Sequence, residues 1–182
     1  MVQRLSDFRV PPGFRGRSAL FTQVWWIVQA CLIRPSPQPC YAWRVFWLRL
    51  FGAQIGDGVM IRQSARVTYP WKVTIGDNSW IGDRAELYSL ERIEIGSNVC
   101  ISQDCYLCTG SHDMTDPAFG YACGAITVED ESWLAAGTFV APGVTVRRGA
   151  VAGARSVVLH DMAAGMVHAG QPARPIRPRI VP

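Results

Sequence analysis

The sequence predicts an all-β protein, a parallel β-helix of triangular cross-section with short helices before it. Three observations lead to this fold class. An aliphatic residue returns every six positions through residues 55–107, and the same period resumes at Val128 and continues to Val158. Near-identical tripeptides also recur every 20 residues: Ile55-Gly56-Asp57, Ile75-Gly76-Asp77 and Ile95-Gly96-Ser97.

A six-residue period is typical of stacked coils and not of an α-helix. Residues six apart lie about 600° apart around a helix axis, so this spacing forms no stripe on one helix face. If each hexapeptide is one short strand and one turn, three of them complete a coil, and every aliphatic side chain points inward onto the coil below. The period shifts by two residues between Val73 and Ile75, and again between Ile93 and Ile95, which predicts a corner bulge in each coil.

The core is stable only if several coils stack on one another. Burial of a branched side chain contributes roughly 1.5 to 3 kcal/mol, and ordering the chain offsets most of it. The repeats supply about five coils. At 182 residues the chain fits one domain, which we divide into an arm with capping helices (1–54), the β-helix (55–168) with an ejected loop (108–127), and a basic C-terminal tail (169–182).

Two helices are expected before the repeats, after a polar arm at residues 1–17. The first begins after Ser18, a predicted N-cap, and runs to Ile33; a proline cluster at residues 35–39 ends it. The second runs from about Cys40 to Phe51. The first is too short and too interrupted by polar residues to span a bilayer. Two interpretations stay open: the helices cap the end of the prism, or their aromatic and arginine side chains contact the inner face of the plasma membrane peripherally.

Charge is distributed unevenly along the chain. Residues 1–51 hold seven arginines against Asp7, residues 52–173 are acidic, and the last nine residues hold three arginines. With one lysine, Lys72, and no basic stripe, the composition argues against nucleic-acid binding. The two basic ends of the chain fit phosphate ligands or an anionic membrane better than they fit a nucleic acid.

The six cysteines do not form a disulfide pattern. Cys105 and Cys108 form one CxxC with no second pair, so we interpret the cysteines as small core residues and not as a zinc or redox site. Reduced cysteines favour a cytoplasmic location. The first eighteen residues also lack the apolar run of a secretory signal.

The ejected loop is the first place to look for function, because a break in a strict repeat sacrifices stacking. It contains His112, where the chain leaves the predicted prism. An imidazole titrates near neutral pH and accepts a proton from an attacking alcohol, which suits a general base. A solvated or hydrogen-bonding histidine is the competing interpretation.

Several motifs resemble the hexapeptide-repeat acyltransferases, and within them the colanic-acid and exopolysaccharide O-acetyltransferases. The resemblance covers nearly the whole chain from about Ser18. It rests on Thr109-Gly110-Ser111-His112-Asp113 with Asp116-Pro117-Ala118-Phe119, Trp133-Leu134-Ala135-Ala136-Gly137, Pro142-Gly143-Val144, Ala169-Gly170-Gln171-Pro172-Ala173-Arg174-Pro175-Ile176, Trp43-Arg44, Leu50-Phe51-Gly52-Ala53, Tyr69-Pro70-Trp71-Lys72 and Ile101-Ser102-Gln103.

The resemblance implies a left-handed β-helix, an exception to the usual crossover handedness. It also implies a homotrimer that binds acetyl-CoA, and no metal, between neighbouring prisms. His112 matches the family's base, which deprotonates the acceptor as the acceptor attacks the thioester directly. The donor for the developing oxyanion falls at the backbone N–H of Ala136.

The same resemblance implies a set of residues that contact the cofactor. Small residues at Gly137, Gly153 and Ala154 leave room for the pantetheine arm, although tight turns need small residues in any case. Trp133 is expected to point outward beside the cofactor or against a neighbouring subunit. Arg174 matches a residue near the CoA phosphates, Arg155 is a further candidate, and a solvated basic tail is the alternative for Arg174.

The predicted function is acetyl-CoA-dependent O-acetylation of a sugar hydroxyl in exopolysaccharide or capsule biosynthesis, in the cytoplasm or at the inner face of the plasma membrane. Tyr88, Asp113 and Phe119 are the candidate contacts to the carbohydrate acceptor. Two other functional classes are alternatives. One is a non-catalytic hexapeptide-repeat scaffold. The other is a metal enzyme resembling the gamma carbonic anhydrases, which need three converging histidines, whereas this chain has only His112, His160 and His168.

Overall fold

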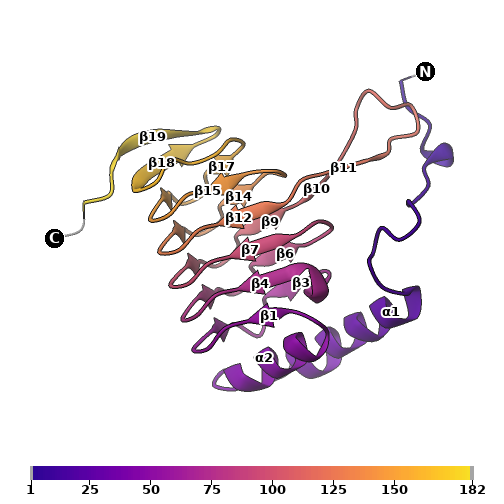
Figure 1. The fold of residues 1–182 in the computed structure, drawn as a ribbon, viewed down its shortest axis with the longest axis horizontal. Helices are drawn as coiled ribbons and strands as arrows, with labels where there is room; N and C mark the ends of the chain where they lie inside the picture. Colours follow the sequence, from indigo (N-terminus) through magenta and orange to yellow (C-terminus); the bar gives the residue numbers. More distant parts are fainter. Residues whose placement is uncertain (1, 181–182) are drawn as a thin grey trace.

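The computed structural model describes residues 2–180 and confirms a parallel β-helix with two short helices before it (Figure 1). Each strand of the coils pairs in parallel with the strand one coil away, which gives the prism three sheet faces. Face 1 contains β1 (Gln54–Ile55), β4 (Val73–Ile75), β7 (Ile93–Ile95), β12 (Ile126–Val128) and β15 (Thr145–Val146). Face 2 contains β2 (Met60–Ile61), β5 (Trp80–Ile81), β8 (Cys100–Ile101), β13 (Trp133–Leu134), β16 (Val151–Ala152), β18 (Met166–Gly170) and β19 (Ala173–Pro178). Face 3 contains β3 (Arg66–Val67), β6 (Glu86–Tyr88), β9 (Tyr106–Cys108), β14 (Phe139–Val140) and β17 (Val157–Val158).

The inward aliphatic positions form the core, as the period predicts. On face 2, Ile61 lies beside Ile81, Ile81 beside Ile101, and Ile101 beside Leu134 in parallel register. Ile101 and Leu134 have an exposed fraction of 0%. The strands make five complete coils, and β18 belongs to part of a sixth. A side chain one position away from each inward residue points outward, so the sequence period decides which residues remain available for binding.

The corners of the coils leave no room for side chains at certain glycines. A Cβ added to Gly76 would lie 2.6 Å from the backbone of Gly96 and Ser97 in the next coil. Such close approach between coils explains why a small residue follows the inward aliphatic at this corner.

The two helices lie across the N-terminal end of the prism (Figure 1). α1 (Ala19–Val28) continues into a π-helical turn (Gln29–Ile33), and α2 is Tyr41–Leu50. The predicted N-cap is present, because Ser18 Oγ accepts a hydrogen bond from the Phe21 N–H. Within the described residues, no helix is long and apolar enough to cross a bilayer.

The contacts of the helices with the first coil are specific. Trp25 is completely buried, and its Nε1 donates to the Val67 carbonyl over 2.9 Å. Arg44 of α2 is completely buried although it is charged, and it donates to the Ile61 carbonyl and to three oxygens around the Pro35–Pro39 turn. Burial lowers the pKa of Arg44 from its ordinary value. The helices therefore close the end of the core.

Two segments outside the coils are also folded. The arm, residues 2–17, contains a 3-10 turn (Leu5–Asp7) and runs along the prism toward the ejected loop (Figure 1). It is held by Trp71 Nε1 and Lys72 Nζ, which donate to the carbonyls of Arg15 and Phe14. At the other end, the segment expected as a basic tail forms β19, which turns back antiparallel to β18.

Candidate active site

The segment after β9 leaves the prism as a hairpin. β10 (Gly110–His112) pairs antiparallel with β11 (Tyr121–Cys123), and His112 stands opposite Tyr121. The hairpin lies at the corner where face 3 passes to face 1, the position at which the sequence predicts an ejected loop.

The base of the hairpin is fixed by a buried threonine. Thr109 Oγ1 donates to the Tyr88 carbonyl over 2.7 Å and accepts from the Glu91 N–H over 2.8 Å. The next residue, Gly110, lies against Tyr88 and Leu90, where an added Cβ would come within 2.6 Å of the Leu90 side chain. Tyr88, a candidate acceptor contact, therefore lies beneath the hairpin, half-buried, and burial raises the pKa of its phenol.

The imidazole of His112 has a defined hydrogen bond. Its Nδ1 lies 2.6 Å from the carbonyl oxygen of Phe119. Because a carbonyl oxygen only accepts hydrogen bonds, this contact assigns the proton of the neutral ring to Nδ1. Nε2 then carries the free lone pair, which is the tautomer that a general base requires.

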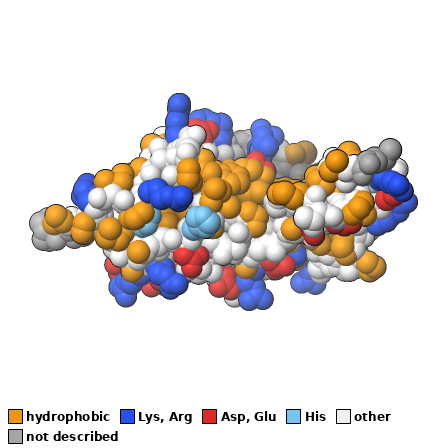
Figure 2. Space-filling view, turned by 90° about the horizontal axis from the view of Figure 1, so that it is seen from above, with side chains coloured by type: hydrophobic (Ala, Val, Ile, Leu, Met, Phe, Trp, Pro, Cys, Tyr) orange, Lys and Arg blue, Asp and Glu red, His pale blue; other side chains and the backbone are white. Residues whose placement is uncertain are grey.

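Aromatic side chains surround the imidazole. The Phe119 ring stacks on it at 4.1 Å between centroids and 8°, and the Tyr121 ring stacks at 4.9 Å. Phe8, from the N-terminal arm, approaches the edge of the imidazole at 5.6 Å and that of Tyr121 at 5.2 Å. The arm is held further by Phe14, which stacks on Tyr121 at 4.4 Å. Figure 2 shows hydrophobic side chains gathered in the middle of the upper surface of the molecule, with most of the charged side chains along its edges.

The two aspartates of the loop accept hydrogen bonds from other loop residues and not from the imidazole. Asp113 Oδ1 accepts from the N–H and hydroxyl of Thr115, and these bonds lower the pKa of Asp113. Asp116 accepts from the N–H groups of Ala118 and Gly120. Phe119 lies between these turns in the left-handed region, with φ of 55°. Its carbonyl oxygen points toward the His112 ring.

A groove of about 640 Å³ lies beside the corner where face 2 passes to face 3. It contains four of the residues expected at the cofactor: Trp133, Ala136, Gly153 and Ala154. Trp133 points outward, 44% exposed, and its Nε1 donates to Ser102 Oγ over 3.0 Å. Ser102 and Gln103 also line this groove, where no sequence pattern placed them, although both belong to the Ile101-Ser102-Gln103 motif.

The backbone of the Ala136 turn leaves one donor free. Gly137 N–H donates to the Gln103 carbonyl, and the Ala136 carbonyl accepts from Arg155 N–H. Within residues 2–180 the N–H of Ala136 donates no hydrogen bond, and Ala136 is half-exposed in the groove. A free backbone N–H in such a groove can stabilise a developing negative charge. Gly137 and Arg155 support this turn from outside the groove lining.

The arginines that face the groove differ from the predicted one. Arg177 and Arg179 contribute to the lining, whereas the exposed Arg174 does not. Arg179 Nη1 donates to the carbonyls of Glu131 and Gly149. The antiparallel return of β19, which the repeat did not predict, brings these two arginines beside the groove.

His112 and Ala136 occupy different corners of the prism. The hairpin leaves the corner between faces 3 and 1, and the Ala136 turn forms the corner between faces 2 and 3. One face is a hexapeptide wide, which is about 20 Å at about 3.3 Å per residue. The base and the free N–H of one chain therefore lie at opposite edges of face 3.

The rest of the described surface offers no metal site. No cluster of three or more His, Cys, Asp or Glu side chains among residues 2–180 could hold a metal ion. All six cysteines are free thiols; Cys105 is buried, but the other five are exposed or half-buried, so the prediction of core cysteines was right only for Cys105.

Comparison with known proteins identifies relatives that match nearly the whole chain. The putative colanic acid biosynthesis acetyltransferase WcaF of Escherichia coli is 51% identical over 179 residues, which is 98% of each chain. The galactoside O-acetyltransferase of the same organism is 28% identical over 129 residues, 69% of this chain and 63% of the relative. No family model matches the chain.

Solved structures share the fold. The hexapeptide-repeat acetyltransferase VCA0836 of Vibrio cholerae superposes with a TM-score of 0.83 at 21% identity, over 97% of this chain and 98% of the other. Galactoside acetyltransferase in complex with coenzyme A gives a TM-score of 0.78 at 21% identity, over 94% and 84%. These similarities confirm the predicted left-handed β-helix. The chain is therefore an acetyltransferase of the hexapeptide-repeat family, and within it belongs to the family of the colanic acid biosynthesis acetyltransferase WcaF.

Proposed function

We propose that the enzyme transfers the acetyl group of acetyl-CoA to a hydroxyl group of a carbohydrate during exopolysaccharide biosynthesis, without a metal. A relative that is 51% identical is named for colanic acid biosynthesis, and a more distant one for galactoside O-acetylation. Acetyl-CoA is bound in a solved VCA0836 structure that superposes with a TM-score of 0.81 at 24% identity, over 91% of this chain and 92% of that chain. Because acetyl-CoA is a cytoplasmic metabolite, we assign the reaction to the cytoplasm.

The hydrogen bond between His112 Nδ1 and the Phe119 carbonyl is the observation that carries this proposal. Nε2 removes the proton of the acceptor hydroxyl while the hydroxyl oxygen attacks the thioester carbonyl carbon. The tetrahedral oxyanion then collapses, the C–S bond breaks, and the CoA sulfur leaves with the proton that the imidazolium returns. No acyl-enzyme forms in this sequence.

The free N–H of Ala136 is the proposed donor to the oxyanion. A fixed backbone donor acts only on the charge that develops, and removal of one such donor costs about 10²–10³ in turnover in other enzymes. Because the main chain supplies the donor, alanine is acceptable at this position.

The groove of about 640 Å³ is the proposed cofactor site. Trp133, Gly153 and Ala154 line it beside Ala136 and leave space for the pantetheine arm. Gly137 shapes the same turn. Arg155 and Arg174 remain predicted phosphate contacts, and we add Arg177 and Arg179, which line the groove.

A homotrimer would complete the site. Because His112 and Ala136 of one chain lie at different corners of the prism, a catalytic arrangement needs the hairpin of one subunit beside the groove of a neighbour. We therefore propose three subunits with the active sites between them. Tyr88, Asp113 and Phe119 remain the predicted contacts to the sugar; the stacking of Phe119 on the imidazole also supports a positioning role.

The test is CoA thiol release from acetyl-CoA with a panel of sugars and nucleotide-sugars. We expect release that requires both an acceptor and His112, with His112→Ala lowering turnover by about 10²–10⁴. The matched control is His160→Ala, which removes an exposed histidine outside the groove and the hairpin. Full activity in His112→Ala would exclude this residue as the base. Absence of both release and CoA binding would favour the non-catalytic scaffold, and sedimentation mass tests the trimer.

A further inference from the structure

The outer face of the two helices is apolar where a solvated helix would be polar. We call this surface the outer helix face. Its side chains are the exposed apolar ones of the two helical segments, whereas the buried Trp25, Val28 and Leu48 already close the core, so core closure does not require them. The outer helix face comprises Leu20, Val24, Trp26, Ile27, Leu32, Trp43, Phe46 and Leu50, with exposed fractions from 36% to 75%.

The parts of this surface on the two helical segments meet where Trp43 contacts Leu32. Trp43 Nε1 of α2 donates to the Leu32 carbonyl at the end of the first helical segment over 2.9 Å. The Trp43 ring lies 6.4 Å from that of Phe46 and 5.5 Å from that of Trp47. Tryptophan rings with one wet edge and one apolar body are typical of the boundary between water and lipid.

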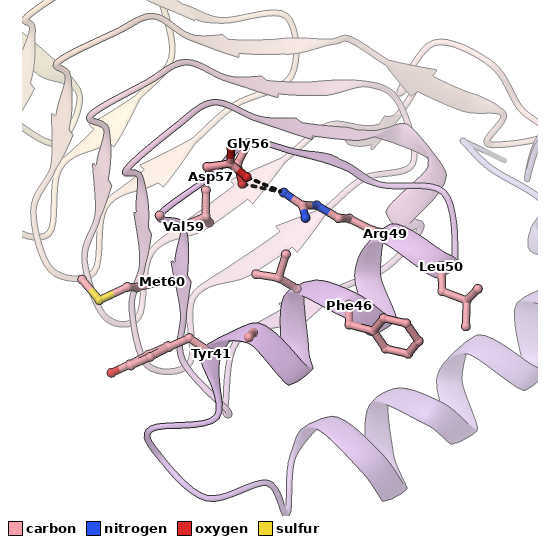
Figure 3. Close-up of a pocket in the computed structure, with 11 residues that line it drawn as sticks. Tyr41, Phe46, Arg49, Leu50, Gly56, Asp57, Val59 and Met60 are labelled. Carbon is pink, nitrogen blue, oxygen red and sulfur yellow. Dashed lines mark hydrogen bonds and ion pairs between the residues drawn. The ribbon is translucent and has the colours of Figure 1, made fainter.

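A groove of about 550 Å³ borders this surface between α2 and the first coil. Arg49 turns toward Asp57 and the coil, while Phe46 and Leu50 project away from that pair (Figure 3). The lining is mostly apolar and includes Val45, Phe46, Leu50, Val59 and Met60. None of the residues of the proposed active site lies here.

The segment that carries the outer helix face contains basic residues and no acidic ones. Between Asp7 and Asp57 the chain has six arginines and no acidic residue. Arg17 and Arg34 flank the first helical segment and are exposed, whereas Arg49 near the end of α2 is paired with Asp57 at 3.4 Å. Basic residues around an apolar helix face complement the phosphates of anionic lipids. A protein partner would instead have to present acidic side chains to these arginines.

From these observations, we propose that the outer helix face docks on the surface of an anionic phospholipid bilayer. The helical run from Ala19 to Ile33 is shorter than the roughly 20 residues that span a bilayer, so it lies in the interface plane. The helices close the N-terminal end of the prism (Figure 1), so the coils extend away from the lipid. This docking does not depend on acetyl transfer.

The experiment is flotation of the full-length protein with vesicles of phosphatidylcholine alone or with phosphatidylglycerol added. We expect binding to the anionic vesicles that decreases with salt. Ile27→Ser with Phe46→Ser removes two exposed apolar side chains, and should lower the vesicle partition coefficient by about tenfold or more. Arg34→Gln should lower binding to the anionic vesicles by about fivefold and leave the weaker neutral binding unchanged.

Leu159→Ser is the matched control, because Leu159 is 46% exposed but lies at the opposite end of the prism from the helices. It should bind vesicles like the wild type. Wild-type protein that stays unbound with anionic vesicles overturns the proposal. The proposal is also overturned if the variant with both Ile27→Ser and Phe46→Ser stays folded by circular dichroism and binds the vesicles normally. A lower sedimentation mass in that variant, without vesicle binding by the wild type, would assign the surface to contacts between copies.

Discussion

Substitution of Phe8 by alanine should release the beginning of the N-terminal arm from the hairpin that carries His112. Phe8 makes two edge-to-face contacts, with His112 at 5.6 Å and with Tyr121 at 5.2 Å. Such aromatic pairs contribute about 0.5–1.5 kcal/mol each beyond area burial, so their loss weakens docking by about 1–3 kcal/mol. The undocked population should then rise by about 5- to 150-fold.

Trypsin cleavage after Arg4 and Arg9, followed by mass spectrometry, measures that population, because cleavage tracks the open state when opening is fast. Val10→Ala is the control: Val10 is 44% exposed and makes no aromatic contact. The rest of the arm stays attached in Phe8→Ala through the stacking of Phe14 on Tyr121. Equal cleavage rates in Phe8→Ala and the wild type would refute this account of the arm. If His112 is the base, turnover should also fall severalfold, with an unchanged KM for acetyl-CoA.

Three further predictions concern stability. Ile101→Ala removes a completely buried side chain and should lower the free energy of unfolding by about 2–5 kcal/mol in urea titrations, whereas Thr127→Ala, on an outward half-buried position, should cost much less. Gly76→Ala places a Cβ 2.6 Å from the next coil and should destabilise the protein far more than Gly143→Ala. At Gly143 the added Cβ meets nothing within 4 Å, and only the positive φ opposes the substitution. Thermal melts that rank the two variants in reverse would contradict the packing argument. Burial raises the pKa of the Cys105 thiol from 9.0 to about 11. The unfolded chain therefore loses this proton first, and stability should decline between pH 9 and 11 by up to about 2–3 kcal/mol, a decline that Cys105→Ala should reduce.

The sequence alone determined the architecture of the coils. The six-residue period is a local rule: it states which side chain faces the core at each strand, and Ile61, Ile101 and Leu134 occupy the inward positions that it assigns. The break in the period located the hairpin with His112, and Ser18 marked the first turn of α1. The outward position of Trp133 beside Ala136 follows from the same period.

Contacts between irregular segments were decided only by the tertiary structure. Phe8 is about a hundred residues from His112, and no period links an arm to a loop, so the aromatic surroundings of the imidazole could not be read from spacing. Arg44 carries a charged side chain, yet it is buried, because carbonyls of the proline turn and of Ile61 accept hydrogen bonds from its guanidinium. Likewise, the antiparallel return of β19 brings Arg177 and not Arg174 to the groove. The reason is physical: periodicity fixes the face that each residue presents, whereas contacts across long separations depend on where the assembled coils bring those faces together.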